Sequence, residues 1–415
     1  MNYSIIVVGD ELLIGQVVDT NSGWIARHML PLGWTAHSVK VVADSAESIT
    51  QAIDEAFAHT DVVLMTGGLG PTKDDITKST LCHYFGGVLV YNQATATNVA
   101  EVMQKRGLEL NDYTRSQAMV PSSCRVIQNE VGTAPLMWYE SNGKVLVSMP
   151  GVPHEMSTML QREVAPQLIA HFKTDMSIMH RTFVVVDVIE SALAMKLNDF
   201  ENNLPAHLHL AYLPQPGIVR LRLTGMLPNR SQLEQDIEQQ SARLHNILGD
   251  AIWCDEDKTI AQIVGDLLKK HQLTMSTAES CTGGNIAHVI TEIAGSSQYF
   301  LGSVVSYANA VKESVLHVSP TTIAAHGVVS EPVVEQMVTG VCQALGTDCA
   351  VATSGIAGPG GAVPGKPVGT VWMAAKCNDK VTTQCLHLPG DRSRVINRAT
   401  VEALKMLCKM LRELQ

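Results

Sequence analysis

The 415-residue chain lacks several features that would assign it to a particular class of protein. Its nine cysteines contain no CxxC pair, so neither a disulfide framework nor a cysteine-bound zinc site is expected. No apolar run reaches the roughly 18 residues of a membrane span, and the short apolar run at the start has no signal-peptide charge. These absences predict a protein that stays in the reducing cytoplasm and has no membrane partner.

Positive charge is also scarce. The chain has 30 lysines and arginines against 40 aspartates and glutamates, and its formal net charge is −10. Without a basic cluster, a nucleic-acid partner has little electrostatic support. Phosphorylated small molecules stay open as ligands, because glycine-loop amides, helix N-termini and a few cations can bind phosphate locally.

The length exceeds what one hydrophobic core usually serves, and three segments differ in pattern. We place domains at 1–170, 176–250 and 256–415. In the first, short β-rich runs alternate with helical stretches, which indicates an α/β domain with a mostly parallel sheet and helices on both faces. The second contains a hairpin pattern around a Pro-Gln-Pro-Gly turn, typical of a small α+β module. The third is again α/β and closes with a long helix from about Ser393.

A first glycine loop, 66–70, follows a buried strand and precedes Asp74 and Asp75, which we expect to open a helix. Glycines let the backbone approach a ligand with its amides turned inward, so the loop predicts a phosphate site. The alternative is a tight turn in which Thr72 or an aspartate caps the helix. Two acids at 10–11, at the end of another strand, favour the first interpretation, because carboxylates beside a phosphate suggest a bridging divalent cation.

A serine and a cysteine, Ser280 and Cys281, lie between a predicted strand and a helix that begins with the glycine pair 283–284. An N-cap role for the serine is the common alternative to chemistry. A hydroxyl nucleophile needs a base, for which Lys312 is the candidate. Cys281 is a rival nucleophile, because a helix N-terminus lowers a thiol pKa. We prefer Ser280, because the nearest histidine in the sequence, His288, falls inside the following helix.

The segments GDELLIGQVVDTN, TGGLGPTKDD, GTAP and MPGVPHEM resemble the N-terminal domain of the competence/damage-inducible protein A (CinA) family. That domain is similar to the molybdopterin-binding domain of molybdenum-cofactor biosynthesis proteins and is associated with metal-dependent ADP-ribose pyrophosphatase activity. The resemblance implies a nucleotide site and, within it, a divalent metal held by Asp10, Asp74 and Asp75. The implied nucleotide-site residues are Asp10, Glu11, Thr66, Gly67, Gly68, Asp74, Asp75, Gly132 and Thr133. Leu136 replaces the usual glycine after GTAP and is expected to narrow the backbone approach to the ligand.

The middle module resembles the family's KH-like domain. KH domains clamp nucleic acid with a GxxG loop, and none occurs between Met176 and Leu248. We therefore expect a spacer or dimerisation element here. A homodimer is implied by the resemblance alone.

The series AESCTGG, SYANAVK, SGIAGPGG and KPVGTV closely resembles the family's nicotinamide mononucleotide (NMN) deamidase domain. It implies hydrolysis of NMN to nicotinate mononucleotide and ammonia without a cofactor. From residue types, Ser280 would attack the carboxamide, Lys312 would take its proton, and Tyr307 would relay the proton or pack on the ring. Backbone amides of 281–284 would hold the oxyanion. The implied substrate-binding residues are Cys281, Thr282, Gly283, Gly284, Asn309, Thr353, Ser354, Gly355, Gly358, Pro359, Gly360 and Gly361, with Arg394 or Arg398 on the phosphate.

Two other functions stay open at this point. One is a regulatory or binding protein linked to competence or DNA damage, against which the acidic balance and the missing GxxG loop argue. The other is a pterin-binding protein of cofactor synthesis, which leaves the C-terminal third unexplained.

Overall fold

The computed structural model describes residues 1–72, 75–172 and 176–414, and the chain divides into two compact units. The first unit comprises Met1–His180 and Gly225–Ile237, and the second comprises Arg181–Thr224 and Glu238–Gln415. The boundary between the units therefore passes through the middle module. None of the helices in the described ranges is long and apolar enough to cross a membrane.

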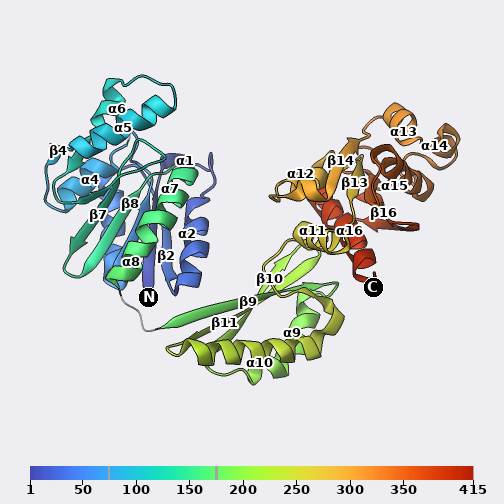
Figure 1. The fold of residues 1–415 in the computed structure, drawn as a ribbon, viewed down its shortest axis with the longest axis horizontal. Helices are drawn as coiled ribbons and strands as arrows, with labels where there is room; N and C mark the ends of the chain where they lie inside the picture. Colours follow the sequence, from blue (N-terminus) through green and yellow to red (C-terminus); the bar gives the residue numbers. More distant parts are fainter. Residues whose placement is uncertain (73–74, 173–175, 415) are drawn as a thin grey trace. The chain divides into compact units, whose positions relative to one another are not determined.

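The N-terminal domain is built on a six-stranded sheet in the order β2-β1-β3-β8-β7-β6 (Figure 1). Its strands are β1 (Asn2–Val8), β2 (Thr35–Val42), β3 (Val62–Thr66), β6 (Arg125–Ile127), β7 (Leu136–Ser141) and β8 (Lys144–Met149). The first four strands in this order are parallel to one another. At one edge, β7 pairs antiparallel with β8, and β6 pairs antiparallel with β7. This arrangement confirms the predicted mostly parallel sheet.

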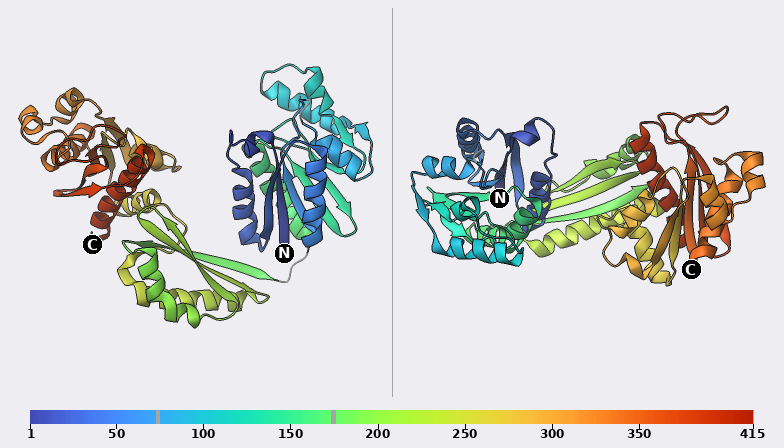
Figure 2. Two further views of the ribbon diagram at one scale, coloured as in Figure 1. Left: turned by 180° about the vertical axis from the view of Figure 1, so that it is seen from behind. Right: turned by 90° about the horizontal axis from the view of Figure 1, so that it is seen from above.

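Helices cover both faces of this sheet (Figures 1 and 2). Successive side chains of a strand point to opposite faces, so Ile5 packs with residues of α2, α7 and α8, whereas Ile6 packs with α3 and α4. The helices are α1 (Asp10–Leu13), α2 (Asn21–Met29), α3 (Ala46–His59), α4 (Thr77–Tyr84), α5 (Gln93–Lys105), α6 (Asp112–Ser116), α7 (Pro153–Met159) and α8 (Ala165–His171). A separate pair, β4 (Leu89–Tyr91) and β5 (Met119–Pro121), lies outside the main sheet.

The middle module is an α+β unit with a four-stranded sheet in the order β10-β11-β9-β12. Its elements are β9 (Ser177–Val186), α9 (Glu190–Asn202), β10 (Leu208–Gln215), β11 (Ile218–Leu227), α10 (Arg230–Leu248) and β12 (Ile252–Cys254). Within the second unit, Val184, Val186 and Ile218 of this module share one hydrophobic core with the C-terminal domain.

The C-terminal domain has a five-stranded sheet in the order β14-β13-β15-β16-β17. Its strands are β13 (Met275–Glu279), β14 (Phe300–Val305), β15 (Cys349–Gly355), β16 (Thr370–Cys377) and β17 (Lys380–His387). The first three strands in this order are parallel to one another. β16 pairs antiparallel with β15, and β17 pairs antiparallel with β16. The strands β13, β15 and β16 are predominantly buried, whereas the edge strands β14 and β17 are partly exposed.

Two layers of helices enclose this sheet. Residues of α11 (Ile260–His271), α12 (Asn285–Thr291) and α16 (Arg392–Arg412) form the core on one face. Residues of α13 (Asn309–Leu316) and α15 (Glu331–Leu345) form the core on the other, and α14 (Pro320–His326) lies between these two in sequence. The helix α11 has the sequence IAQIVGDLLKKH and begins with a capping box made by Thr259 and Gln262.

The helix after the first glycine loop begins later than the sequence suggested. It starts at Thr77, with Ile76 at the N-cap, so Asp75 does not open it. The carboxylate of Asp75 instead accepts hydrogen bonds from the backbone amides of Gly70 (2.8 Å) and Thr72 (2.9 Å). The aspartate thus closes the loop on itself rather than capping the helix. Asp74 lies outside the described residues.

Candidate functional site

A cavity of about 220 Å³ lies at the carboxyl ends of the parallel strands β13, β14 and β15. Ligands of open α/β sheets bind at this edge. The residues that line it are Ser280, Cys281, Tyr307, Asn309, Lys312, Val328, Val329, Ser354, Gly355, Ala357 and Arg392. The structure therefore brings together predicted residues from three loops that are far apart in the sequence.

Ser280 and Lys312 contact each other in this cavity. The Nζ atom of Lys312 lies 3.2 Å from the Oγ atom of Ser280 and also donates to the carbonyl of Ser306. Lys312 is only 1% exposed, and its burial lowers the pKa of the ammonium group. A lysine with a lowered pKa loses its proton more readily, so next to a serine hydroxyl it can act as the general base.

Cys281 is placed less favourably for nucleophilic chemistry. Its side chain is 5% exposed, and burial raises the pKa of the thiol to about 12, with the charge of Glu279 adding to the rise. Because the thiolate is the reactive form, a thiol with this pKa is almost entirely unreactive at neutral pH. The local electrostatics therefore favour Ser280 over Cys281.

The glycine pair after Cys281 shapes the turn into α12. Gly283 and Gly284 have φ values of +61° and +98°, in the left-handed region that side chains disfavour. The amide of Gly283 donates to the carbonyl of Ser280, and the amide of Gly284 donates to the carboxylate of Glu279. Of the four amides expected to hold an oxyanion, those of Cys281 and Thr282 are the ones that bind no other described residue.

An arginine lies at the edge of the cavity, but it is Arg392 rather than the two predicted ones. The guanidinium of Arg392 donates to the hydroxyl of Tyr307 and to the carbonyl of Gly358, both at 2.8 Å. Arg398 is paired with Glu402 at 2.8 Å, and neither it nor Arg394 lines the cavity. The charge available to a substrate phosphate at this cavity is therefore that of Arg392.

The remaining predicted residues of the second glycine loop divide into two groups. Ser354 and Gly355 line the cavity. Thr353 does not line it, but its hydroxyl forms a 2.8 Å hydrogen bond with that of Thr282 in the turn after Ser280. The other predicted residues of the loop do not line the cavity, although Gly358 binds Arg392 through its carbonyl. These non-lining residues are Gly358, Pro359, Gly360 and Gly361.

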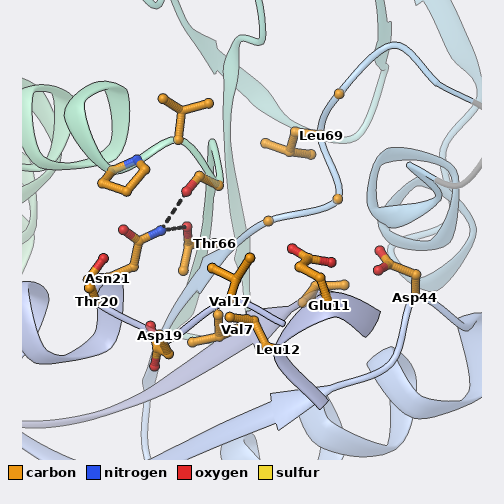
Figure 3. A pocket seen from close by; sticks show the side chains of 18 of the residues that line it. Val7, Glu11, Leu12, Val17, Asp19, Thr20, Asn21, Asp44, Thr66 and Leu69 are labelled. Carbon is orange, nitrogen blue, oxygen red and sulfur yellow. Dashed lines mark hydrogen bonds between the residues drawn. The ribbon is translucent and has the colours of Figure 1, made fainter. Parts of the chain in front are cut away.

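A second cavity, of about 400 Å³, lies at the carboxyl ends of β1, β3 and β8 in the N-terminal domain (Figure 3). Of the predicted residues, Glu11, Thr66, Gly67, Gly68 and Asp75 line it. Figure 3 shows Glu11 and Asp44 on one side and Asn21 with Thr66 on the other. Asn21 donates to the hydroxyl of Thr66 (3.1 Å) and the carbonyl of Gly151 (2.8 Å), which ties α2 to the ends of two strands.

The aspartate Asp44, which the sequence did not single out, completes this acidic group. The amide of Asp10 donates to the carboxylate of Asp44 (3.0 Å), and the amide of Asp44 donates to Asp10 (3.2 Å). Burial raises the pKa of Asp44, and the charges of Asp10, Glu11 and Asp75 add to the rise despite the hydrogen bond from Asp10. Its position directly after the run VKVVA, at the end of a parallel strand, is the sequence signal that marks it.

Two predicted features of the N-terminal site lie elsewhere. Gly132 and Thr133 do not line the cavity; Gly132 packs closely against the carboxylate of Glu155. Leu136 is fully buried in the core at the start of β7, so it does not face the cavity and does not narrow it. In both cases, a position in or next to a glycine-containing motif did not place the residue at the cavity.

The described residues do not fit a metal site. No three histidine, cysteine, aspartate or glutamate side chains among them are arranged to hold an ion. Asp75 is engaged by the amides of its own loop, and Asp10 and Asp44 bind each other's amides. Of the predicted metal ligands, Asp10 and Asp75 are thus engaged within the protein.

Comparison with known proteins decides the family. A CinA-like protein of Flavobacterium psychrophilum is 42% identical over 413 residues, which cover 99% of this chain and 98% of that protein. The chain belongs to the CinA family. A CinA-like protein of Cytophaga hutchinsonii is 41% identical over 99% of this chain and 98% of its own length.

Three family models match this CinA-family chain in the expected order. "Probable molybdopterin binding domain" matches residues 4–170, "Damage-inducible protein CinA KH domain" matches 180–254, and "CinA C-terminal domain" matches 257–411. A crystal structure of a competence-damaged protein (CinA) superfamily protein from Klebsiella pneumoniae is 35% identical and covers 37% of this chain and 97% of its own, with a TM-score of 0.37. The family resemblance inferred from the sequence motifs is therefore confirmed.

Proposed function

We propose that the C-terminal domain hydrolyses the carboxamide of NMN to nicotinate mononucleotide and ammonia. The observation that carries the proposal is the 3.2 Å contact between Lys312 Nζ and Ser280 Oγ in a small cavity with an arginine at its edge. Acyl transfer needs a hydroxyl nucleophile, a base and amide donors for the oxyanion, and each has a candidate here.

In the proposed reaction, neutral Lys312 accepts the hydroxyl proton as Ser280 Oγ attacks the carboxamide carbon. The amides of Cys281 and Thr282, which bind no other described residue, stabilise the oxyanion. Lys312 then returns the proton to the nitrogen, and ammonia leaves. Water hydrolyses the resulting ester with Lys312 again as base, and Lys312 passes the proton on to Ser280 Oγ, which releases nicotinate mononucleotide and restores Ser280.

Phosphate recognition is assigned to Arg392 in this proposal. It already holds Tyr307 and Gly358, so its guanidinium has a fixed orientation at the edge of the cavity. A fixed guanidinium is well suited to a phosphate, which it can bind with parallel hydrogen bonds. Tyr307, which is 62% exposed, is then oriented by Arg392 to pack on the nicotinamide ring or relay a proton.

The activity is tested by incubating the full chain with NMN and measuring released ammonia by a coupled assay. The proposal expects ammonia and nicotinate mononucleotide in equal amounts without an added cofactor. A pure, folded chain that releases no ammonia contradicts it.

We propose a second activity for the N-terminal cavity, the hydrolysis of the diphosphate bond of ADP-ribose. Its support is the loop of Gly67 and Gly68 beside carboxylates at the strand ends, in a cavity of about 400 Å³. Because the described carboxylates do not form a metal-ligand set, we derive no step through a divalent cation. The test is release of AMP from ADP-ribose in a screen of divalent cations, and the absence of AMP under every condition contradicts it.

A further inference from the structure

The residue before the proposed nucleophile has a carboxylate that is completely buried. Glu279 is 0% exposed, and no lysine, arginine or histidine among the described residues forms an ion pair with it. A buried charge without a cation is costly unless hydrogen-bond donors surround it. The neighbourhood of Glu279 must therefore supply those donors.

Five donors converge on this carboxylate, all from the segment around the nucleophile. Oε2 accepts from the hydroxyl of Thr282 (2.7 Å) and the amides of Gly284 and Ile286 (both 3.0 Å). Oε1 accepts from the amide of Ala287 (2.8 Å) and the hydroxyl of Thr277 (3.2 Å). The donors lie before and after Ser280, so the carboxylate ties together both ends of the turn.

The backbone of Glu279 is linked to the base as well. Its carbonyl accepts from the amide of Ser306 (2.8 Å), and the carbonyl of Ser306 accepts from the ammonium of Lys312. The hydroxyl of Thr282 also bonds Thr353 on β15. The 280–284 turn is thus linked through hydrogen bonds both to Lys312 and to the second glycine loop.

We infer that Glu279 is a positioning residue, whose carboxylate holds the 280–284 turn so that Ser280 stays within reach of Lys312 and the amides of Cys281 and Thr282 keep their place in the turn. The inference rests on the proposed function for its catalytic consequence. Glu279 also removes the amide of Gly284 from the four expected oxyanion donors, and the carbonyl of Ser280 removes that of Gly283. A second consequence is that its negative charge opposes thiolate formation at Cys281.

The test compares Glu279→Gln with the matched control Glu292→Gln, which removes the same charge from an exposed glutamate of the same segment. Glutamine has the same shape but offers an NH₂ group where amide donors converge, so the turn should shift. Misplacement of reacting groups by about 1 Å lowers kcat about 10²-fold. We expect that loss in kcat for Glu279→Gln with KM for NMN changed less than about threefold, and no change for Glu292→Gln.

A second readout is independent of catalysis. Hydrogen exchange of peptides covering 280–290 should accelerate at least about tenfold in Glu279→Gln, because glutamine keeps one acceptor oxygen instead of two. Either the amides of Gly284 and Ile286, on Oε2, or that of Ala287, on Oε1, then face an NH₂ group. Thr282→Val, which removes one donor and its bond to Thr353, serves if Glu279→Gln does not fold, and should lower kcat about tenfold.

Five results decide the inference. Faster exchange with a kcat loss at constant KM supports it. A folded Glu279→Gln enzyme with wild-type kcat overturns it, as does a Thr282→Val enzyme with wild-type kcat where Glu279→Gln fails to fold. Unchanged exchange in Glu279→Gln overturns it too, even in a chain without activity toward NMN. If the wild-type chain releases no ammonia but hydrogen exchange is still faster in Glu279→Gln than in the wild type, the proposed function is contradicted. The inference that Glu279 holds the 280–284 turn is then still supported.

Discussion

Lys312 Nζ lies 3.2 Å from Ser280 Oγ, although 32 residues separate the two in the sequence. The lysine is carried by α13 and the serine by the turn after β13, so the contact exists because β13 and β14 are adjacent parallel strands. The proposed catalytic pair is therefore a product of sheet topology.

Replacement of the serine separates the two rival nucleophiles. Ser280→Ala should lower kcat for NMN by at least about 10³-fold, because no other described group in the cavity combines a hydroxyl with a neighbouring base. Cys281→Ala should stay within about tenfold of wild type, because its thiol is protonated and buried. Steady-state ammonia release measures both, and an active Ser280→Ala enzyme contradicts the assignment.

The pH dependence should follow the titration of Lys312. The ammonium form cannot accept a proton, and burial lowers the pKa of Lys312 below its usual 10.5. Activity should therefore rise with pH through a midpoint below 10.5 and reach a plateau where the amine is neutral. Lys312→Met should abolish this rise and lower kcat about 10²- to 10⁴-fold. A rising limb that persists in Lys312→Met assigns the base elsewhere.

Arg392 should determine the affinity for the phosphate. Arg392→Ala should raise KM for NMN about 10- to 100-fold, the effect of losing a charge-assisted hydrogen bond of about 1.5–3 kcal/mol. Hydrolysis of nicotinamide riboside, which has no phosphate, should fall much less, because this substrate loses only the orientation of Tyr307 by Arg392. Arg394→Ala is the matched control, because Arg394 lies on the same helix but does not line the cavity. Equal losses for both substrates would contradict a phosphate role.

The first glycine loop should not tolerate a side chain. A Cβ at Gly67 would lie 2.1 Å from the carbonyl oxygen of Val8, at φ +107°, so Gly67→Ala should lower the free energy of unfolding by about 2 kcal/mol or more. Gly86→Ala, at φ +69° with no atom within 4 Å, carries the backbone cost alone and should lose about 1 kcal/mol. Urea unfolding followed by tryptophan fluorescence measures both, and equal losses would contradict the steric argument. The N-terminal domain carries Trp24, Trp34 and Trp138.

Much of the fold follows from local patterns in the sequence. The alternation of buried runs and amphipathic stretches predicts the mostly parallel N-terminal sheet and a further α/β domain at the C-terminus. Glycines close to the ends of β3, β13 and β15 mark the strand ends where the two cavities lie. These signals are local because strand burial and backbone conformation depend on neighbouring residues.

The parts that sequence reasoning missed depend on contacts between distant segments. Three arginines of α16 are alike in sequence, and only packing decides that Arg392 reaches Tyr307 whereas Arg398 pairs with Glu402. Asp44 joins the acidic group through Asp10, 34 positions away. Glu279 directly precedes Ser280 in the sequence, and its role as an acceptor for five donors appears only once the turn is folded.

The most direct test of the account is stoichiometric ammonia release from NMN by the purified full chain, with Ser280→Ala measured alongside under identical conditions. The account predicts one ammonia for each nicotinate mononucleotide formed by the wild type and a rate at least about 10³-fold lower in the variant. Absence of ammonia from the folded wild type, or equal rates in the two proteins, would contradict it.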